Sequence, residues 1–107
     1  MRIIKEADWK LLRELRAPVL DRYCEKLLRE ANSPRKTAER HSQDMFMRAL
    51  GILQNGNDDI MNGFGDLRRS NALERLAFMK TKGIITTAEI ARFSKETQET
   101  VSRFEQK

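Results

Sequence analysis

The chain has 107 residues and carries 21 basic against 16 acidic side chains, a net charge of +5. This length suits one domain, residues 1–107, and excludes a large enzyme with a separate cofactor-binding domain. One cysteine and one histidine exclude an intramolecular disulfide and a zinc site made of Cys and His ligands. No stretch is long and uncharged enough to span a bilayer, and the first residues lack an apolar signal region. We therefore expect a cytoplasmic protein without a membrane partner.

Residues 7–31 show the three- and four-residue spacing of apolar side chains that is typical of an amphipathic helix. Pro18 lies inside this stretch, where it lacks an N–H donor and crowds the preceding turn. Because the apolar stripe keeps its phase across Pro18, the pattern favours one kinked helix over two separate helices.

A second long helix is predicted from Pro34 to about Gln54, because Ser33-Pro34 combines a hydroxyl cap with a proline in the first turn. The connection to the first helix is then about three residues long, which makes the two helices an antiparallel hairpin. Asn55-Gly56-Asn57 is interpreted as a stop, after which Asn57 caps a short helix that ends near Gly63.

The remaining chain is predicted to form short helices. One ends at Gly83, whose left-handed turn lets Ile84 fold back onto Met79. Thr86 and Glu89 have the spacing of a capping box that opens a helix through Phe93. Ser94 then caps a last helix.

The fold class predicted is therefore all-α, a compact helical bundle of about five to six helices built on a long antiparallel helical hairpin. Its core is predicted from the apolar stripes of these helices, namely Trp9, Leu12, Leu15, Val19, Tyr23, Leu27, Met45, Ala49, Leu53, Leu73, Leu76, Ile85, Ile90, Phe93 and Val101.

Residues 87–104 read Thr-Ala-Glu-Ile-Ala-Arg-Phe-Ser-Lys-Glu-Thr-Gln-Glu-Thr-Val-Ser-Arg-Phe. This segment resembles the helix-turn-helix of lactose-repressor and catabolite-activator type regulators. The resemblance implies a first helix over 87–93 and a recognition helix over 97–104. The side chains it would turn toward DNA are Thr97, Gln98, Ser102 and Arg103.

The same segment departs from that family's pattern at two positions. Lys95 stands where the turn usually has glycine, and Glu96 stands where a buried aliphatic residue is usual. The segment also has no excess of basic residues over acidic ones, whereas phosphate binding needs one. The alternative is two short capped helices that close the bundle, with Ser94 as the second cap and Glu96 in the first turn.

Two further groups of residues are candidates for function. Cys24 and His41 both lie about eight residues from the predicted bend, so they could lie at the same height on facing helices. A thiol next to an imidazole is the arrangement of an activated nucleophile. No third group that would orient them is apparent. The second candidate is a basic patch at the hairpin tip made of Lys26, Arg29, Arg35, Lys36 and Arg40.

No catalytic, metal-binding or cofactor-binding residue is predicted, and no cofactor is expected. The sequence favours a small non-catalytic helical adaptor or regulatory module that binds another protein or associates with itself as a homo-oligomer. The alternative is a DNA-binding transcriptional regulator that uses residues 87–104, with nucleic acid as its partner. The second alternative is an enzyme that uses Cys24 and His41.

Overall fold

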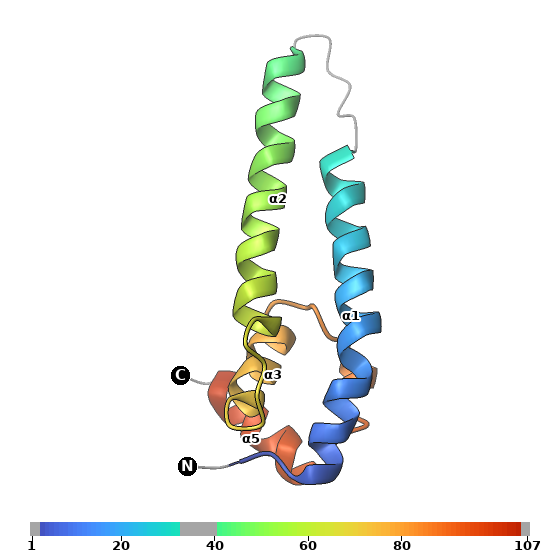
Figure 1. Ribbon diagram of the computed structural model, residues 1–107, viewed down its shortest axis with the longest axis vertical. Helices are drawn as coiled ribbons and strands as arrows, with labels where there is room; N and C mark the ends of the chain where they lie inside the picture. The colour runs from blue at the N-terminus through green and yellow to red at the C-terminus, as the bar shows by residue number, and fades with distance from the viewer. Residues whose placement is uncertain (1–2, 33–40, 106–107) are drawn as a thin grey trace.

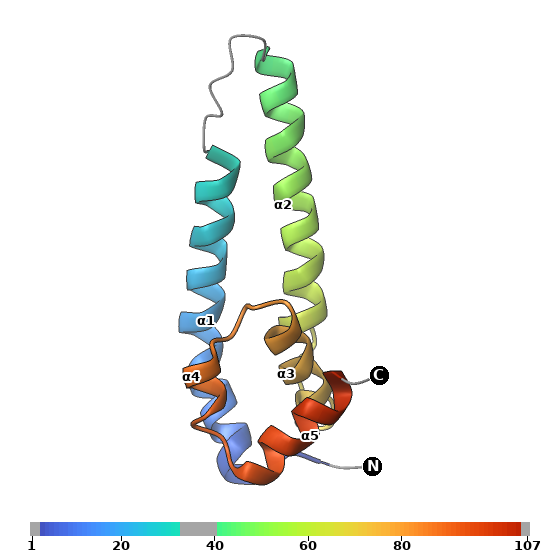
Figure 2. The same ribbon diagram turned by 180° about the vertical axis from the view of Figure 1, so that it is seen from behind.

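The computed structural model describes residues 3–32 and 41–105, and this part of the chain contains helices and no strand (Figure 1). The predicted all-α bundle is thereby confirmed. Its helices are α1 (Glu6–Asn32), α2 (Ser42–Phe64), α3 (Ala72–Thr81), α4 (Thr87–Ile90) and α5 (Lys95–Glu105). Helices α1 and α2 form a hairpin, and α3, α4 and α5 gather at one end of it (Figures 1 and 2). The molecule is elongated, with extents of 53 × 27 × 24 Å.

Helix α1 continues without interruption through Pro18, as the unbroken phase of its apolar stripe predicts. Of that stripe, Trp9 is half-buried and the other members, Leu12, Leu15, Val19, Tyr23 and Leu27, are buried. The carbonyl of Glu30 near its C-terminal end accepts a hydrogen bond from Arg48 Nη1 at 3.2 Å. The long side chain of Arg48 thus connects α2 to the last turns of α1.

Helix α2 is one continuous element, so the predicted stop at Asn55-Gly56-Asn57 and the separate helix after it are wrong. Gly56 is buried because α1 passes very close to it. A Cβ atom built on Gly56 would lie 2.4 Å from Leu27 Cδ1. Gly56 therefore allows α1 and α2 to pack closely and does not end a helix. The predicted start at Pro34 lies outside the described residues, and α2 as described begins at Ser42.

The predicted core is wrong at the outer end of α2. Met45 and Leu53 are 38% and 40% exposed, and Ala49 is only half-buried. The contact of Leu27 with Gly56 sets Asn32, the last residue of α1, level with about residue 51 of α2, so Met45 lies beyond the last turn of its neighbour. An apolar residue in a helix is buried only where a second element covers it.

The core lies at the base of the hairpin, where α3, α4 and α5 pack. Gly83 has a φ of +69°, and the N–H of Ile84 donates to the carbonyl of Met79 at 2.8 Å, which is the predicted chain reversal after α3. The core also contains buried apolar residues outside the predicted core set, namely Ile4, Phe64, Ala72, Ala77, Met79 and Ile84.

The close approach of the two long helices predicts opposite effects of alanine at two glycines of α2. Gly56→Ala forces Leu27 to move and should lower the free energy of unfolding by about 1–3 kcal/mol. At Gly51 nothing lies within 4 Å of an added Cβ. Gly51→Ala should therefore raise the free energy of unfolding by about 0.5–1 kcal/mol through helix propensity alone. Urea unfolding followed by circular dichroism measures both changes, and a loss of stability at Gly51 would contradict this packing.

Candidate functional site

The structure places the segment with helix-turn-helix resemblance at the base of the bundle. Helix α4 opens with the predicted capping box, in which Thr86 and Glu89 each accept the other's backbone N–H. Helix α5 begins at Lys95, two residues earlier than the resemblance implies. The backbone N–H of Thr97 donates to Ser94 Oγ at 3.3 Å, so Ser94 caps α5 as the alternative reading predicts.

Thr97 is 3% exposed, which differs from the outward orientation that the resemblance implies. Its Oγ1 donates to Oδ2 of Asp8, a buried carboxylate on α1, at 2.6 Å. Asp8 also accepts bonds from the backbone N–H and the hydroxyl of Ser94, at 3.1 Å and 2.6 Å. One carboxylate from the other end of the chain therefore holds the first turn of α5 and turns Thr97 inward.

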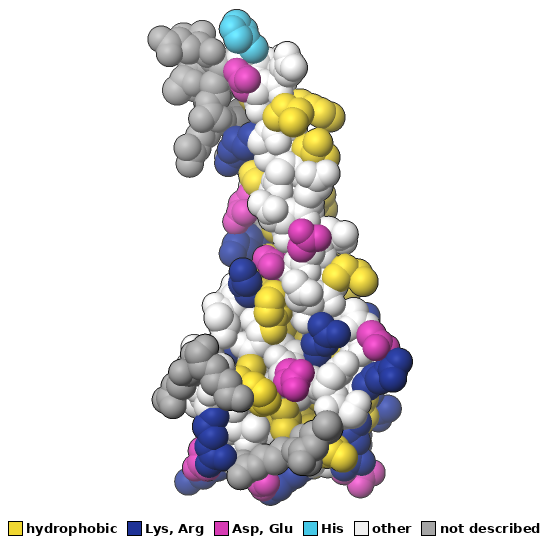
Figure 3. Space-filling view, turned by 90° about the vertical axis from the view of Figure 1, so that its left-hand side faces the viewer, with side chains coloured by type: hydrophobic (Ala, Val, Ile, Leu, Met, Phe, Trp, Pro, Cys, Tyr) yellow, Lys and Arg dark blue, Asp and Glu magenta, His cyan; other side chains and the backbone are white. Residues whose placement is uncertain are grey.

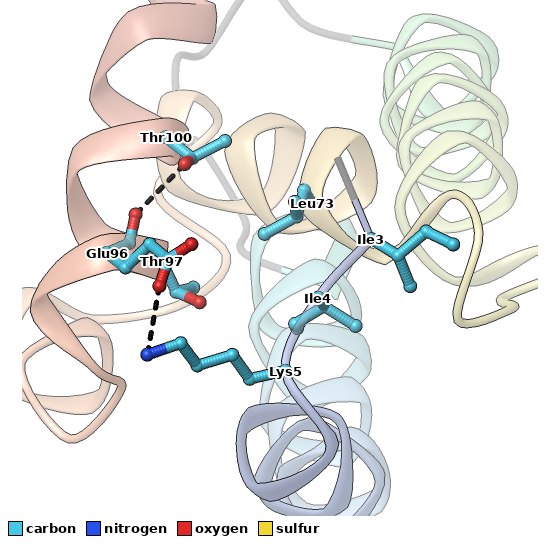
Figure 4. Close-up of a pocket in the computed structure, with 7 residues that line it drawn as sticks. All are labelled: Ile3, Ile4, Lys5, Leu73, Glu96, Thr97 and Thr100. Atoms are coloured by element: carbon cyan, nitrogen blue, oxygen red, sulfur yellow. Dashed lines mark hydrogen bonds and ion pairs between the residues drawn. The ribbon is translucent and has the colours of Figure 1, made fainter. Parts of the chain in front are cut away.

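Figure 4 shows Thr97 among the side chains that line a cavity between the N-terminal segment and α5. The cavity measures about 10 Å³, room for about one water molecule. Lys5 Nζ and Glu96 Oε2 form an ion pair at 2.9 Å, and both side chains are more than half exposed. Glu96 therefore meets solvent, in agreement with the alternative reading in which it belongs to the first turn of α5.

The other three residues implied by the resemblance do not form one outward surface with each other. Gln98 is half-buried, and its Nε2 donates to the carbonyl of Phe93 at 2.8 Å. Ser102 is half-buried as well, whereas Arg103 is exposed. The role of Asp8 was not predicted from the sequence. An acidic residue near the start of a long helix ordinarily interacts with the helix dipole and gives no signal of a distant partner.

A second set of hydrogen bonds joins α1 to α4. We call this set and the bonds of Asp8 to α5 the two carboxylate clamps. Arg22 donates from both terminal nitrogens to Glu89, at 2.8 Å and 3.1 Å, and also to the carbonyl of Ile84 at 2.9 Å. The hydrogen bond with Arg22 contributes most to lowering the pKa of Glu89 to about 2, and the capping bonds from Thr86 lower it further. The pKa of the Asp8 carboxyl is also lowered, since burial raises it but the bonds from Ser94 and Thr97 together outweigh burial.

These lowered pKa values predict a loss of stability in acid. The carboxyl of Glu89 titrates near 4.5 in the unfolded chain and at about 2 in the folded chain. Its contribution is therefore complete above about pH 4.5 and disappears as the pH falls toward 2. The difference in free energy of unfolding between the wild type and Glu89→Gln should stay constant from neutral pH to about pH 5 and then shrink toward zero. The exposed Glu14→Gln serves as control, and a difference independent of pH would contradict the clamp.

The structure does not bring Cys24 and His41 together, so the predicted level pair is wrong. Leu27 lies against Gly56, and Tyr23 Oη donates to Asp59 Oδ2 at 3.1 Å. These two contacts place half-buried Cys24 next to the middle of α2. His41 is the exposed N-cap of α2, fifteen residues before Gly56, which corresponds to roughly 22 Å along the helix axis.

The predicted basic patch is described only in part. Arg35, Lys36 and Arg40 lie outside the described residues. Lys26 and Arg29 are exposed on the last turns of α1, and Lys26 Nζ lies 3.9 Å from Glu30 Oε1. The described part of the patch therefore combines one ion-paired lysine with an exposed arginine.

The outer hairpin, residues 21–32 of α1 and 42–58 of α2, projects beyond α3, α4 and α5 (Figures 1 and 2). This part of the fold carries most of the large hydrophobic side chains that are exposed among the described residues. They are Leu28, Met45, Phe46, Met47 and Leu53, with Phe46 the most exposed at 64%. Isolated exposed apolar residues are ordinary, whereas a concentration of them on one part of a fold is unusual.

Helical geometry shows that three of these side chains, Leu28, Phe46 and Leu53, lie on one side of the hairpin. The contact between Leu27 and Gly56 marks where α1 and α2 face each other. Successive residues turn by about 100°, and antiparallel helices turn in opposite senses when both are viewed from one end. Equal rotations therefore bring residues of both helices to the same side of the hairpin.

On α1, Cys24 and Leu28 lie about 60° and 100° from the direction of Leu27. On α2, Leu53 and Phe46 lie about 60° and 80° from the direction of Gly56, and Leu50 about 120°. We call this common side, made of Cys24, Leu28, Phe46, Leu50 and Leu53, the apolar face of the outer hairpin.

The opposite side is charged. It contains four charged residues that lie about 60° to 120° from the direction of the Leu27–Gly56 contact, in the opposite sense of rotation. They are Lys26 and Glu30 on α1, and Asp44 and Arg48 on α2. Figure 3 shows this division, with hydrophobic side chains along the right-hand edge of the upper part and charged ones along the left. The outer hairpin is thus amphipathic as a unit.

No protein-family model, curated protein or solved structure matches this chain. Among the residues that the structure describes, no three His, Cys, Asp or Glu side chains lie together as a metal site would require. None of the described helices combines the length and the apolar character needed to cross a bilayer.

The burial of Thr97 and the bond of Gln98 to Phe93 predict the outcome of a DNA titration. We expect no salt-sensitive binding of duplex DNA that depends on Gln98 and Arg103, because specific readout requires side chains free to enter a groove. Fluorescence titrations at low and moderate salt would compare the wild type with Gln98→Ala/Arg103→Ala and with Arg35→Ala/Lys36→Ala. Binding that is abolished by Gln98→Ala/Arg103→Ala but not by Arg35→Ala/Lys36→Ala would contradict this expectation. It would favour the DNA-binding regulator as the function of this protein.

Proposed function

We propose that this protein is a small non-catalytic adaptor or regulatory module that binds another protein through the apolar face of its outer hairpin. One observation carries the proposal: Phe46, Leu53 and Leu28 are exposed together on the part of the hairpin that projects beyond the three C-terminal helices (Figure 1). Removing such side chains from water on binding contributes about 25 cal/mol per Å² of apolar surface.

The form of the molecule supports the same function. The base of the bundle contains the buried core and both carboxylate clamps, so it can hold a projecting hairpin in a defined position. Two further exposed side chains on the outer end of α2 are methionines, Met45 and Met47. Methionine side chains are flexible and polarisable, and they are common on surfaces that bind helices of varied shape.

Cys24, the one cysteine of the chain, provides a direct test because it lies on the apolar face. A photo-crosslinker attached to Cys24 of the full chain should give a discrete protein adduct in an extract of the native host. That adduct should disappear in Phe46→Ser. This substitution should leave the fold intact, because the side chain of Phe46 is exposed. In the control, Cys24→Ser/Glu30→Cys, the crosslinker stands on the charged side and should give no such adduct.

Two outcomes would overturn the proposal. One is the absence of any discrete adduct from Cys24, and the other is an adduct that persists in Phe46→Ser. An adduct whose partner proves to be a second copy of this chain would show self-association through the same face, which the sequence also allows.

A further inference from the structure

Exposed arginines lie near the start of α1, on the side that this helix turns toward α2. Arg13 and Arg16 are exposed and lie about 40° and 20° to either side of the direction of Leu27, and half-buried Trp9 lies in that direction itself. The guanidinium of Arg13 stands over the Trp9 ring, 5.8 Å from its centroid. Helix α2 ends at Phe64, level with about residue 19 of α1, so it does not extend far enough to cover these side chains.

The loop between α2 and α3 brings two more arginines to the same place. It lies at the height of the lower part of α1 (Figure 1). Arg69 Nε donates to the carbonyl of Ile4, just before α1 begins, at 3.2 Å. Leu67 of this loop packs against the core, as Trp9 does, and Arg68 and Arg69 beside it are exposed. We call the following residues the arginine surface: Trp9, Arg13, Arg16, Arg68 and Arg69.

Most of the positive charge on this surface is not neutralised. Arg13, Arg16 and Arg69 form no ion pair with any carboxylate of the residues that the structure describes. Arg68 is paired with Asp66 at 2.9 Å, and both side chains are more than 60% exposed. An exposed pair of this kind is worth little, so Arg68 can exchange its carboxylate for another anion.

The other charges on this part of α1 lie to one side. Lys10 stands between Glu6 and Glu14 at four-residue spacing, about 60° to 140° from the direction of Leu27. This flank carries no excess of positive charge. The positive charge is therefore concentrated between α1 and the loop, where an anionic ligand would be attracted.

The side chains of the arginine surface match the chemistry of single-stranded nucleic acid. A guanidinium group binds two phosphate oxygens at once, which a lysine ammonium cannot do in the same geometry. Indole rings and guanidinium planes both stack on unpaired bases. An acidic peptide has no bases to stack, and the bases of a duplex are already stacked on each other.

We propose that the arginine surface binds single-stranded nucleic acid. Arg16, Arg68 and Arg69 hold successive phosphates, and one base stacks on the pair formed by Arg13 and Trp9. This inference goes beyond the proposed function, because the arginine surface lies at the base of the bundle and the apolar face on the outer hairpin. It also differs from the helix-turn-helix alternative, in which α5 contacts duplex DNA.

Trp9 is the one tryptophan of the chain, so its fluorescence reports directly on this surface. Titration of the full chain with an oligothymidylate of about ten nucleotides at about 50 mM salt should quench the Trp9 emission. Three phosphate contacts to a single strand give a slope of about −2 in a plot of log K against log salt. Binding should therefore weaken roughly 20-fold when the salt is raised to about 200 mM.

A double variant locates the binding while Trp9 and Arg13 stay in place. Arg16→Ala/Arg68→Ala should weaken binding more than tenfold and reduce the salt slope to about −0.7, because it removes two of the three phosphate contacts. Both side chains are exposed, so circular dichroism should show an unchanged fold. The matched control is Lys26→Ala/Arg29→Ala, which removes two exposed cations of the outer hairpin and should leave affinity and slope nearly unchanged.

Three results would overturn the inference. Unchanged Trp9 emission at about 50 mM salt means that no strand binds at this surface. Equal affinities of the wild type and Arg16→Ala/Arg68→Ala would place the strand elsewhere on the chain. Equal binding of a ten-residue glutamate peptide, or tighter binding of a duplex of the same length, would assign the surface to an acidic protein or to duplex DNA. The crosslink from Cys24 tests the proposed function separately, so the two can fail independently.

Discussion

The contact between Gly56 and Leu27 is the constraint on which the rest of this structure depends. A glycine at this point lets α1 and α2 approach until the leucine side chain occupies the space of a missing Cβ. Close approach fixes which residues of the two helices face each other, and helical periodicity then assigns every other residue of the hairpin to a side. The amphipathic character of the outer hairpin and the distance between Cys24 and His41 both follow from this one contact.

The base of the bundle solves a different problem, which is to hold three short helices in place. Helix α4 has only four residues and α5 has eleven, and helices this short are marginal without tertiary support. Asp8 and Arg22, both on α1, supply that support by reaching the first turn of α5 and the side chain of Glu89 on α4. Charge-assisted hydrogen bonds from Asp8 and Arg22 thus attach the C-terminal segment to helix α1.

The two ends of the molecule therefore have different roles. At the base most apolar side chains are covered, and the carboxylates of Asp8 and Glu89 are held by hydrogen bonds, so this end contributes stability. At the outer end large apolar side chains remain exposed on one side of the hairpin. A preformed helical surface costs less conformational entropy on binding than a segment that must first fold, which is why the proposed function is placed there.

Local structure could be predicted from the sequence alone, because helix periodicity, the Thr86–Glu89 capping box and the turn at Gly83 depend on residues close together in the chain. Which helix faces are covered became known only from the packing of the helices. Gly56 had the local pattern of a stop and proved to be a packing contact, and Thr97 matched a recognition helix and proved to be bound to Asp8. Both outcomes depend on groups distant along the chain, where local propensity carries no information about what packs against a residue.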